Sequence, residues 1–318
     1  MTEVSSNISR AVDLLNQDKL VAIPTETVYG LAGNIYSEKA IKGIFEMKQR
    51  PLFNPLIVHI YDIRQVRELT TDFPEKAQKL AQKFWPGSLT LILPKNEKVP
   101  NLITANKNSV GIRMPDHSVT LELLAQLEFP LAAPSANPFS RISPTTAQHV
   151  KDYFNDKLEL VLDGGPCKNG IESTIVGFEN EEPVIYRLGS ISQEEIEEVI
   201  GKVNINNQEK NAPIAPGMVE KHYAPRTKTV LVENVSDYLQ ANRHLKIGIL
   251  LHQKIDDEQL AHTVKYLTST SDIKEAASLL YASLHELDAL NLDIIVAQKF
   301  PDSGIGKSLN DRLTRATK

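Results

Sequence analysis

The chain has 318 residues and a formal net charge of −5 at pH 7, and its length predicts about two domains. Proteins that coat nucleic acid are usually basic, so the acidic balance argues against that class. The single cysteine, Cys167, excludes an intrachain disulfide and a zinc site built from several cysteines. Charges at Glu3, Arg10 and Asp13 interrupt the N-terminal segment, and no run reaches the roughly 18 apolar residues of a membrane span. We therefore expect a cytoplasmic protein.

Apolar residues recur at helical or strand spacing through residue 200. The spacing predicts helices over residues 5–17, 37–48, 74–84, 121–127, 145–153 and 193–200. Short apolar runs predict strands over residues 20–24, 55–60, 88–94, 109–115, 131–133, 158–163, 173–178 and 183–187. The alternation of helices and strands is typical of the α/β class, and the strands that adjoin near 88–114 and 158–187 indicate a mixed sheet.

The polar segment 201–228 is the best domain boundary in the chain. Its histidine and tyrosine, His222 and Tyr223, are unusual for a plain spacer and suggest that it packs against something. The pattern that follows predicts strands over 229–232, 246–251 and 292–297 and helices over 277–287 and 305–315. We expect a domain over residues 1–205, a linker over 206–228, and a small three-layer, Rossmann-like α/β domain over 229–318.

Polar side chains gather where the predicted strands end, which is where α/β proteins place ligands. Thr25 and Thr27 follow one strand, and Lys48 and Arg50 precede the next. Cations at that spacing suit phosphate groups, although cations at a helix C-terminus can also simply stabilise the helix dipole. The threonines can equally be hydroxyl caps of a turn, and His59 within an apolar strand can be a core histidine.

Later strands add further candidates for an anion site. An arginine within an apolar strand, Arg113, needs an anionic partner if it is buried, and either a ligand carboxylate or a structural acid would serve. Ser135 and Asn137 stand at alternate positions beside small residues, and Ser143 precedes a predicted helix start, which offers free N–H groups or simply a cap. Residues 304–308 look like the end of a P-loop, but proline stands at position 301 where that motif needs glycine.

The order of these motifs resembles the YrdC-like family of threonylcarbamoyl-AMP synthases. The resemblance covers about residues 8–200 through the motifs PTETVYGL, KQRP..NPLIVHI, WPGSLTLIL, VGIRMP, PLAAPSAN, DGG and ESTIV. The later motifs HYAP and DRLTRA are similar to the longer, two-domain form of these enzymes. The resemblance implies a YrdC-like twisted mixed sheet. It also implies synthesis of threonylcarbamoyl-AMP and pyrophosphate from ATP, L-threonine and bicarbonate, for modification of tRNA beside the anticodon.

The resemblance also implies which residues form the site. The family's KxR and SxN motifs carry the nucleotide chemistry, and they correspond here to Lys48, Arg50, Ser135 and Asn137. Further ATP contacts are expected from Asn54, Ser109, Ser143, Arg187 and Tyr223. Threonine is expected to contact Thr27, His59, Arg113, Ser173 and the backbone at Ala133. Family members often have Arg-Pro-Gly where this chain has Arg187-Leu-Gly189, which affects the stiffness of the loop rather than the arginine.

The same resemblance sets expectations for cofactors and partners. We expect Mg²⁺ to accompany ATP, with neither a metal site of the protein's own nor a tightly bound organic cofactor. The product would pass to tRNA threonylcarbamoyl-transfer proteins, with weak tRNA contact and no membrane contact.

Residues 215–225 are expected to fold over the site. The alternative is an RNA-binding or regulatory module with the same fold that does not make the adenylate. Cys167 is expected to be incidental to the chemistry.

Overall fold

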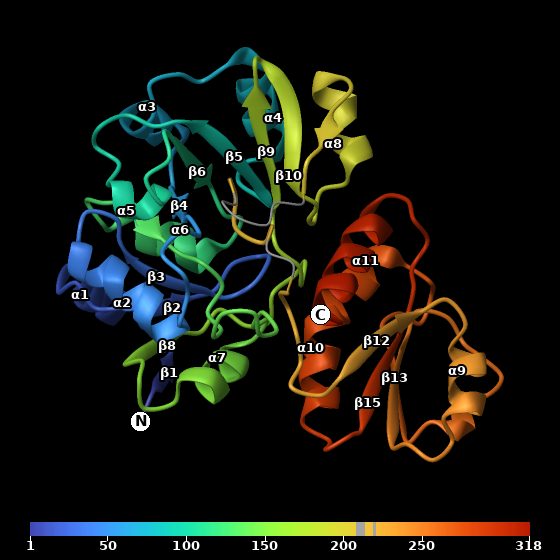
Figure 1. Cartoon of the computed structure of the whole chain (residues 1–318). Coiled ribbons are helices and arrows are strands. Elements are labelled where there is room, and N and C mark those ends of the chain that lie inside the picture. Colours follow the sequence, from blue (N-terminus) through green and yellow to red (C-terminus); the bar gives the residue numbers. More distant parts are fainter. Residues whose placement is uncertain (208–213, 219–220) are drawn as a thin grey trace.

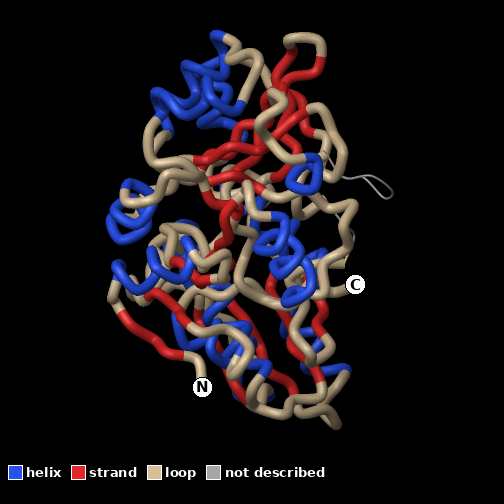
Figure 2. Tube along the Cα trace, turned by 90° about the vertical axis from the view of Figure 1, so that its left-hand side faces the viewer, coloured by secondary structure: helices blue, strands red, loops and turns tan. Residues whose placement is uncertain are grey.

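The computed structural model describes residues 1–207, 214–218 and 221–318, which form two units, each built on its own sheet (Figure 1). We call residues 1–205 the N-terminal unit, 206–228 the linker and 229–318 the C-terminal unit. Seen from a second side, the strands of the larger sheet run through the interior of the N-terminal unit, with helices against them (Figure 2). No helix in the described part of the chain combines the length and apolar character needed to cross a membrane.

The described residues of the N-terminal unit form a sheet of eleven strands in the order β1-β8-β2-β3-β7-β4-β6-β5-β9-β10-β11. The sheet contains both parallel pairs, such as β4 with β6, and antiparallel pairs, such as β5 with β6, so the predicted mixed sheet is confirmed. The strands are β1 (Glu3–Ser5), β2 (Val21–Ile23), β3 (Gly30–Asn34), β4 (Ile57–His59), β5 (Leu89–Pro94), β6 (Ser109–Arg113), β7 (Leu131–Ala132), β8 (Leu160–Leu162), β9 (Thr174–Glu179), β10 (Glu182–Arg187) and β11 (Asn204–Ile205).

Helices cover this sheet with their apolar faces turned inward, as in α2, where Ile41, Ile44 and Phe45 are buried. Ser37 caps α2 by accepting a hydrogen bond from the Ala40 N–H, which satisfies a donor that the first turn leaves free. The helices are α1 (Ile8–Asn16), α2 (Glu38–Lys48), η1 (Ile63–Gln65), α3 (Val66–Leu69), α4 (Glu75–Phe84), α5 (Asn101–Thr104), α6 (Ser118–Ala125), α7 (Ala147–Phe154) and α8 (Gln193–Ile200).

The C-terminal unit is built on a parallel sheet in the order β12-β15-β13-β14. Helices α10 and α11 lie between this sheet and the N-terminal unit, and α9 lies on the opposite face, which gives the predicted three layers (Figure 1). Its elements are β12 (Thr229–Val232), α9 (Val235–Ala241), β13 (Ile247–Leu251), η2 (Glu258–Leu260), β14 (Thr263–Tyr266), α10 (Ile273–Asp288), β15 (Ile294–Gln298) and α11 (Ile305–Ala316).

Several elements differ from the sequence prediction. The helix predicted over 5–17 starts only at Ile8, because Ser5 ends a strand and the Asn7 side chain caps the helix. The helix predicted over 121–127 begins three residues earlier, at Ser118. The sequence pattern did not predict strands β1, β3, β11 and β14, helix α9, or the short helices η1, α3, α5 and η2. Strand β3 carries two glycines and no apolar alternation, so its pairing with β2 and β7 rather than its own pattern makes it a strand.

The two units share a hydrophobic core. Val28, Ile142 and Ile171 of the N-terminal unit pack with Leu280 and Leu284 of α10. All five side chains are almost completely buried. A core shared in this way fixes the orientation of α10 and α11 against the loops that follow the strands of the larger sheet.

The loop after β10 makes a testable packing prediction. A Cβ at Gly189 would lie 2.4 Å from the backbone nitrogen of Thr174, whereas one at Gly43 in α2 meets only the Leu20 side chain at 3.5 Å. We expect Gly189→Ala to lower the free energy of unfolding by about 2 kcal/mol. Gly43→Ala should leave it unchanged or raise it by up to about 1 kcal/mol, since alanine favours a helix. Urea unfolding measures both, and equal midpoints for the two variants would contradict this account.

Candidate functional site

A small cavity of about 50 Å³ lies where loops after the strands of the larger sheet meet the linker. Ligand pockets usually measure about 300–1,000 Å³, so the linker fills most of the space that a ligand would need. The cavity is lined by Thr27, Val28, Arg50, Ile57, His59, Arg113, Ala133, Pro134, Ser135, Glu172, Arg187, Pro216, Gly217, His222 and Tyr223.

Lys48 and Arg50 reach this region because the chain turns sharply between them. Gln49 caps α2 in the left-handed conformation, with φ of 53°, so the chain leaves the helix immediately after Lys48. The Lys48 Nζ donates to the carbonyl oxygens of Ser135 and Asn137, each at 2.5 Å. The predicted KxR and SxN motifs therefore meet through a lysine and two backbone carbonyls. Burial, together with the charge of Arg50, holds the Lys48 pKa well below its usual value.

Arg50 is held by backbone and amide oxygens rather than by a carboxylate. Its Nη2 donates to Asn54 Oδ1 at 2.7 Å and to the Pro55 carbonyl at 2.8 Å. Burial and the neighbouring charge of Arg187 lower the Arg50 pKa to about 9. Arg187 in turn donates to the carbonyl and hydroxyl oxygens of Ser173, each at 2.9 Å. These contacts leave a concentration of positive charge that an anionic ligand would offset.

Arg113 has a structural acid as its partner, which settles one alternative that the sequence left open. Its Nη2 donates to Glu26 Oε1 at 2.7 Å, and both side chains are almost completely buried. Glu26 also accepts from Ser88 Oγ and the Asp116 N–H, so its carboxylate is well satisfied. Arg113 Nη1 donates to no group within the described residues, and this side of the guanidinium remains available to a ligand. Glu26 lies inside the PTETVYGL motif but is not among the site residues predicted from the sequence.

Buried polar atoms without a partner concentrate at this site. Six such side-chain atoms occur in the described residues, and five belong to residues in or beside the cavity. These five are Asn54 Nδ2, His59 Nδ1, Asn137 Oδ1, His222 Nδ1 and Tyr223 Oη. Since buried polar groups are normally hydrogen-bonded, the concentration points to a ligand with several donors and acceptors.

His59 is a neutral imidazole. Burial and the charge of Arg113 lower its pKa to about 3. Thr27, which also lines the cavity, lies with its Oγ1 at 2.9 Å from Thr25 Oγ1. Ala133 also lines the cavity, and its N–H is already bound to the Ile57 carbonyl at 3.2 Å. These groups form a neutral, hydrogen-bonding wall beside the arginines.

Six predicted residues do not line the cavity: Lys48, Asn54, Ser109, Asn137, Ser143 and Ser173. Ser109 lines a neighbouring space of about 10 Å³, which shares Ile57 and Pro216 with the main cavity. Ser143 lies behind the wall, where its Oγ donates to Glu172 Oε1 at 2.6 Å. Asn54, Asn137 and Ser173 are also buried behind the lining residues, and each touches a group that lines the cavity or holds Lys48.

Glu172 joins the cavity to the C-terminal unit. It accepts from Arg312 Nε at 2.8 Å and from Tyr281 Oη at 2.9 Å. Burial opposes its ionisation, but the charges of Arg312 and Arg187 and the hydrogen bond from Ser143 outweigh burial and lower the Glu172 pKa to about 2. Glu172 lies in the ESTIV motif and Arg312 in the DRLTRA motif, but neither is among the site residues predicted from the sequence. No spacing in the sequence links two positions that lie 140 residues apart.

The linker covers the cavity with its described residues. Pro216, Gly217, His222 and Tyr223 form part of the lining. The Pro216 carbonyl accepts from Arg187 Nη1 at 3.3 Å, and a Cβ at Gly217 would lie 2.8 Å from the Tyr223 hydroxyl. Of the segment expected over the site, 215–225, residues 219 and 220 lie outside the described residues.

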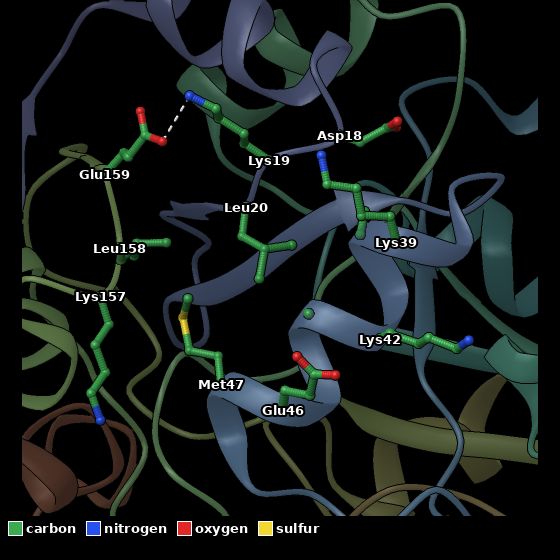
Figure 3. A pocket seen from close by; sticks show the side chains of 12 residues that line it. Asp18, Lys19, Leu20, Lys39, Lys42, Glu46, Met47, Lys157, Leu158 and Glu159 are labelled. Carbon is green, nitrogen blue, oxygen red and sulfur yellow. Dashed lines mark ion pairs between the residues drawn. The ribbon is translucent and has the colours of Figure 1, made fainter.

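A larger groove of about 460 Å³ lies on the outer side of α2 (Figure 3). Leu20 and Met47 form its apolar floor, and Lys39, Lys42 and Lys157 stand around it. The groove shares no residue with the cavity and is open to solvent, so its size does not mark the reactive site.

Cys167 is a buried free thiol that does not line the cavity. Burial raises its pKa to about 12, so the thiol stays protonated at neutral pH. A protonated thiol is a poor nucleophile, which agrees with the expectation that Cys167 takes no chemical part.

Comparison with known proteins gives matches along the whole chain. A family model described as "Telomere recombination" matches residues 13–189, and one described as "Threonylcarbamoyl-AMP synthase, C-terminal domain" matches residues 191–317. The threonylcarbamoyl-AMP synthase of Bacillus subtilis is 40% identical, with 99% of this chain and 94% of that protein covered. The crystal structure of Pyrococcus abyssi Sua5 complexed with L-threonine is similar, with a TM-score of 0.92, 38% identity, and 99% and 97% of the two chains covered.

The charge on Glu172 predicts a specific pH dependence of stability. Its pKa falls from the ordinary 4.5 to about 2 on folding, so the stabilisation is complete above pH 4.5 and is lost as the pH falls towards 2. Between pH 4.5 and 2, the free energy of unfolding of the unmodified chain should fall by about 3 kcal/mol more than that of the Glu172→Gln variant. Urea unfolding at several pH values measures the difference. Glu3→Gln, in an exposed pair with Arg10, is the control and should follow the unmodified chain. An identical pH slope for Glu172→Gln would refute the account.

Proposed function

The chain belongs to the threonylcarbamoyl-AMP synthase family, and from this premise we propose that it forms threonylcarbamoyl-AMP from ATP, L-threonine and bicarbonate, with release of pyrophosphate. The observation that carries the proposal is the set of five buried, unpartnered polar atoms around a cavity lined by three arginines. Such a site suits an anionic ligand with many hydrogen-bonding groups, and a nucleotide beside an amino acid is a ligand of that kind.

We assign the threonine half of the site to the wall around Arg113. Its free Nη1 would bind the threonine carboxylate, since a guanidinium pairs well with that group. His59 would orient threonine through a hydrogen bond, because a histidine with a pKa of about 3 is too weak a base to take a proton at neutral pH. Thr27, Ser173 and the backbone at Ala133 would complete this half.

We assign the nucleotide half to the cationic side of the cavity. Lys48, Arg50 and Arg187 would offset the charge of the phosphates, and Ser135 and Asn137 would fix Lys48 through their carbonyls. The remaining expected contacts are Asn54, Ser109, Ser143 and Tyr223. A nucleotide does not fit into about 50 Å³, so linker residues would have to shift when it binds.

The proposed reaction has two steps. The threonine amine adds to carbon dioxide, supplied by bicarbonate, and loses a proton to give a carbamate. A carbamate oxygen then attacks the α-phosphorus of ATP, and the bond to the bridging oxygen breaks so that pyrophosphate leaves. No side chain needs to form a covalent bond, because Arg50, Arg187 and Lys48 can act by positioning and by offsetting charge.

We further propose that Mg²⁺ enters as the ATP complex and not as a resident metal of the protein. Within the described residues no group of three or more histidine, cysteine or acidic side chains could hold a metal, and Glu26 and Glu172 are already paired with arginines. The product would pass to an enzyme that transfers the threonylcarbamoyl group to tRNA. Both ATP and the tRNA substrate favour a cytoplasmic location.

The direct test is pyrophosphate release from ATP by the full chain. Release should require both L-threonine and bicarbonate, because the carbamate is the nucleophile. Each of the other amino acids, and threonine in bicarbonate-free buffer, serve as controls. Release that needs neither co-substrate would overturn the proposal.

A second test separates the two halves of the site. Arg113→Ala combined with Glu26→Gln removes the carboxylate partner of threonine without leaving a buried unpaired acid. The KM for threonine should rise about tenfold or more, as expected for loss of a charged hydrogen bond, while the KM for ATP stays within about threefold. Glu26→Gln alone is the control for changes in the surrounding wall. Equal effects on both substrates would argue against a carboxylate role for Arg113.

A further inference from the structure

Arg312 on α11 extends from the C-terminal unit and contacts Glu172 and Tyr223, which line the cavity. Its side chain is completely buried, and each of its guanidinium nitrogens has a partner. Nε donates to Glu172 Oε2 at 2.8 Å, Nη2 to the Leu188 carbonyl at 2.6 Å, and Nη1 to Asp311 Oδ2 at 2.8 Å. The guanidinium carbon also lies 4.8 Å from the centre of the Tyr223 ring.

We propose that Arg312 is a positioning residue for the nucleotide half of the site, acting through Glu172 and Tyr223. The proposal deepens the proposed function and rests on it. It gives the C-terminal unit a role in the reaction, although no residue of that unit is among those that line the cavity.

The first contact acts through Glu172. One carboxylate oxygen takes the Arg312 hydrogen bond, while the other accepts from Ser143 Oγ at 2.6 Å. The next residue, Ser173, supplies the oxygens that hold Arg187. A shift of Glu172 would therefore move Ser143 together with the Ser173 carbonyl that holds Arg187. Ser143 and Arg187 both belong to the proposed nucleotide half.

The second contact acts through Tyr223. This residue has a φ of 62°, an uncommon conformation for a tyrosine, and its side chain is buried with the hydroxyl unpartnered. The Arg312 guanidinium packs on the Tyr223 ring, and the ring of Tyr281 stacks near it with its centre 5.8 Å away. A cation over one face and an aromatic ring beside it hold the Tyr223 hydroxyl towards the cavity.

Docking of the two units does not depend on Arg312 alone. The shared core of Val28, Ile142 and Ile171 with α10 already joins them. Lys307 Nζ pairs with Glu194 at 2.8 Å, and Ser308 Oγ donates to the Gly189 carbonyl at 2.9 Å. A merely structural role for Arg312 would add one more contact of this kind, whereas a positioning role would affect nucleotide binding selectively.

The test uses the full chain with Arg312→Lys, which keeps the charge near Glu172 but loses the planar fork. The matched control is Lys307→Met, which breaks an ion pair between the units away from the cavity. Pyrophosphate release is measured at varied ATP and varied threonine, with binding of a non-hydrolysable ATP analogue and of threonine measured at equilibrium. Thermal unfolding of both variants monitors folding.

We expect Arg312→Lys to lower kcat/KM for ATP about tenfold or more and to weaken binding of the analogue. The threonine dissociation constant should stay within about twofold, and Lys307→Met should change neither. Tyr281→Phe, which removes one donor to Glu172 but keeps the ring, should show a smaller effect in the same direction and remains informative if Arg312→Lys does not fold.

Two results would overturn the positioning role: an Arg312→Lys variant that matches Lys307→Met, or equal losses for ATP and threonine. If Arg312→Lys does not fold, a Tyr281→Phe variant that leaves ATP binding unchanged overturns it as well. An unmodified chain without threonine-dependent pyrophosphate release would overturn the proposed function and the positioning role together. An active unmodified chain with unaffected variants would overturn the positioning role alone.

Discussion

The burial of positive charge around one small cavity is the constraint on which the rest of the structure depends. Lys48, Arg50, Arg113 and Arg187 are each no more than 7% exposed. Removing a charge from water costs several kcal/mol unless hydrogen bonds and opposite charges replace the lost hydration. The loops around the cavity must provide hydrogen-bond acceptors in place of the lost water. This requirement explains why so many of their carbonyl, hydroxyl and amide groups point towards the buried cations.

Neutral oxygens meet most of that requirement. Lys48 and Arg50 bind backbone carbonyls and one amide, and Arg187 binds the carbonyl and hydroxyl of Ser173. Neutral acceptors offset only part of a buried charge, and the lowered pKa values of Lys48 and Arg50 reflect what remains. The site is therefore arranged to gain stability from an anion, and the same charge is suited to an α-phosphate at which pyrophosphate leaves.

The carboxylates have a different place in the arrangement. Glu26 and Glu172 are each paired with an arginine. Their negative charges are therefore already balanced within the protein. The Glu26 pair lies within the N-terminal unit, whereas the Glu172 pair crosses between the units through Arg312. The linker lies between the same two units, with Tyr223 against Arg312. The shared core thus places three segments that are distant in sequence around one cavity.

The sequence by itself determined the α/β class, the mixed sheet and most of the longer helices. Its ordered motifs also determined the family. These features follow from local periodicity and from residues close together in the chain. It did not reveal β3, whose glycines carry no strand pattern, or the partners of Arg113 and Glu172. Those depended on the tertiary structure, because a buried ion pair between residues 26 and 113 or 172 and 312 leaves no spacing that can be read along a chain. Only packing brings such pairs together and decides which arginine face stays open to a ligand.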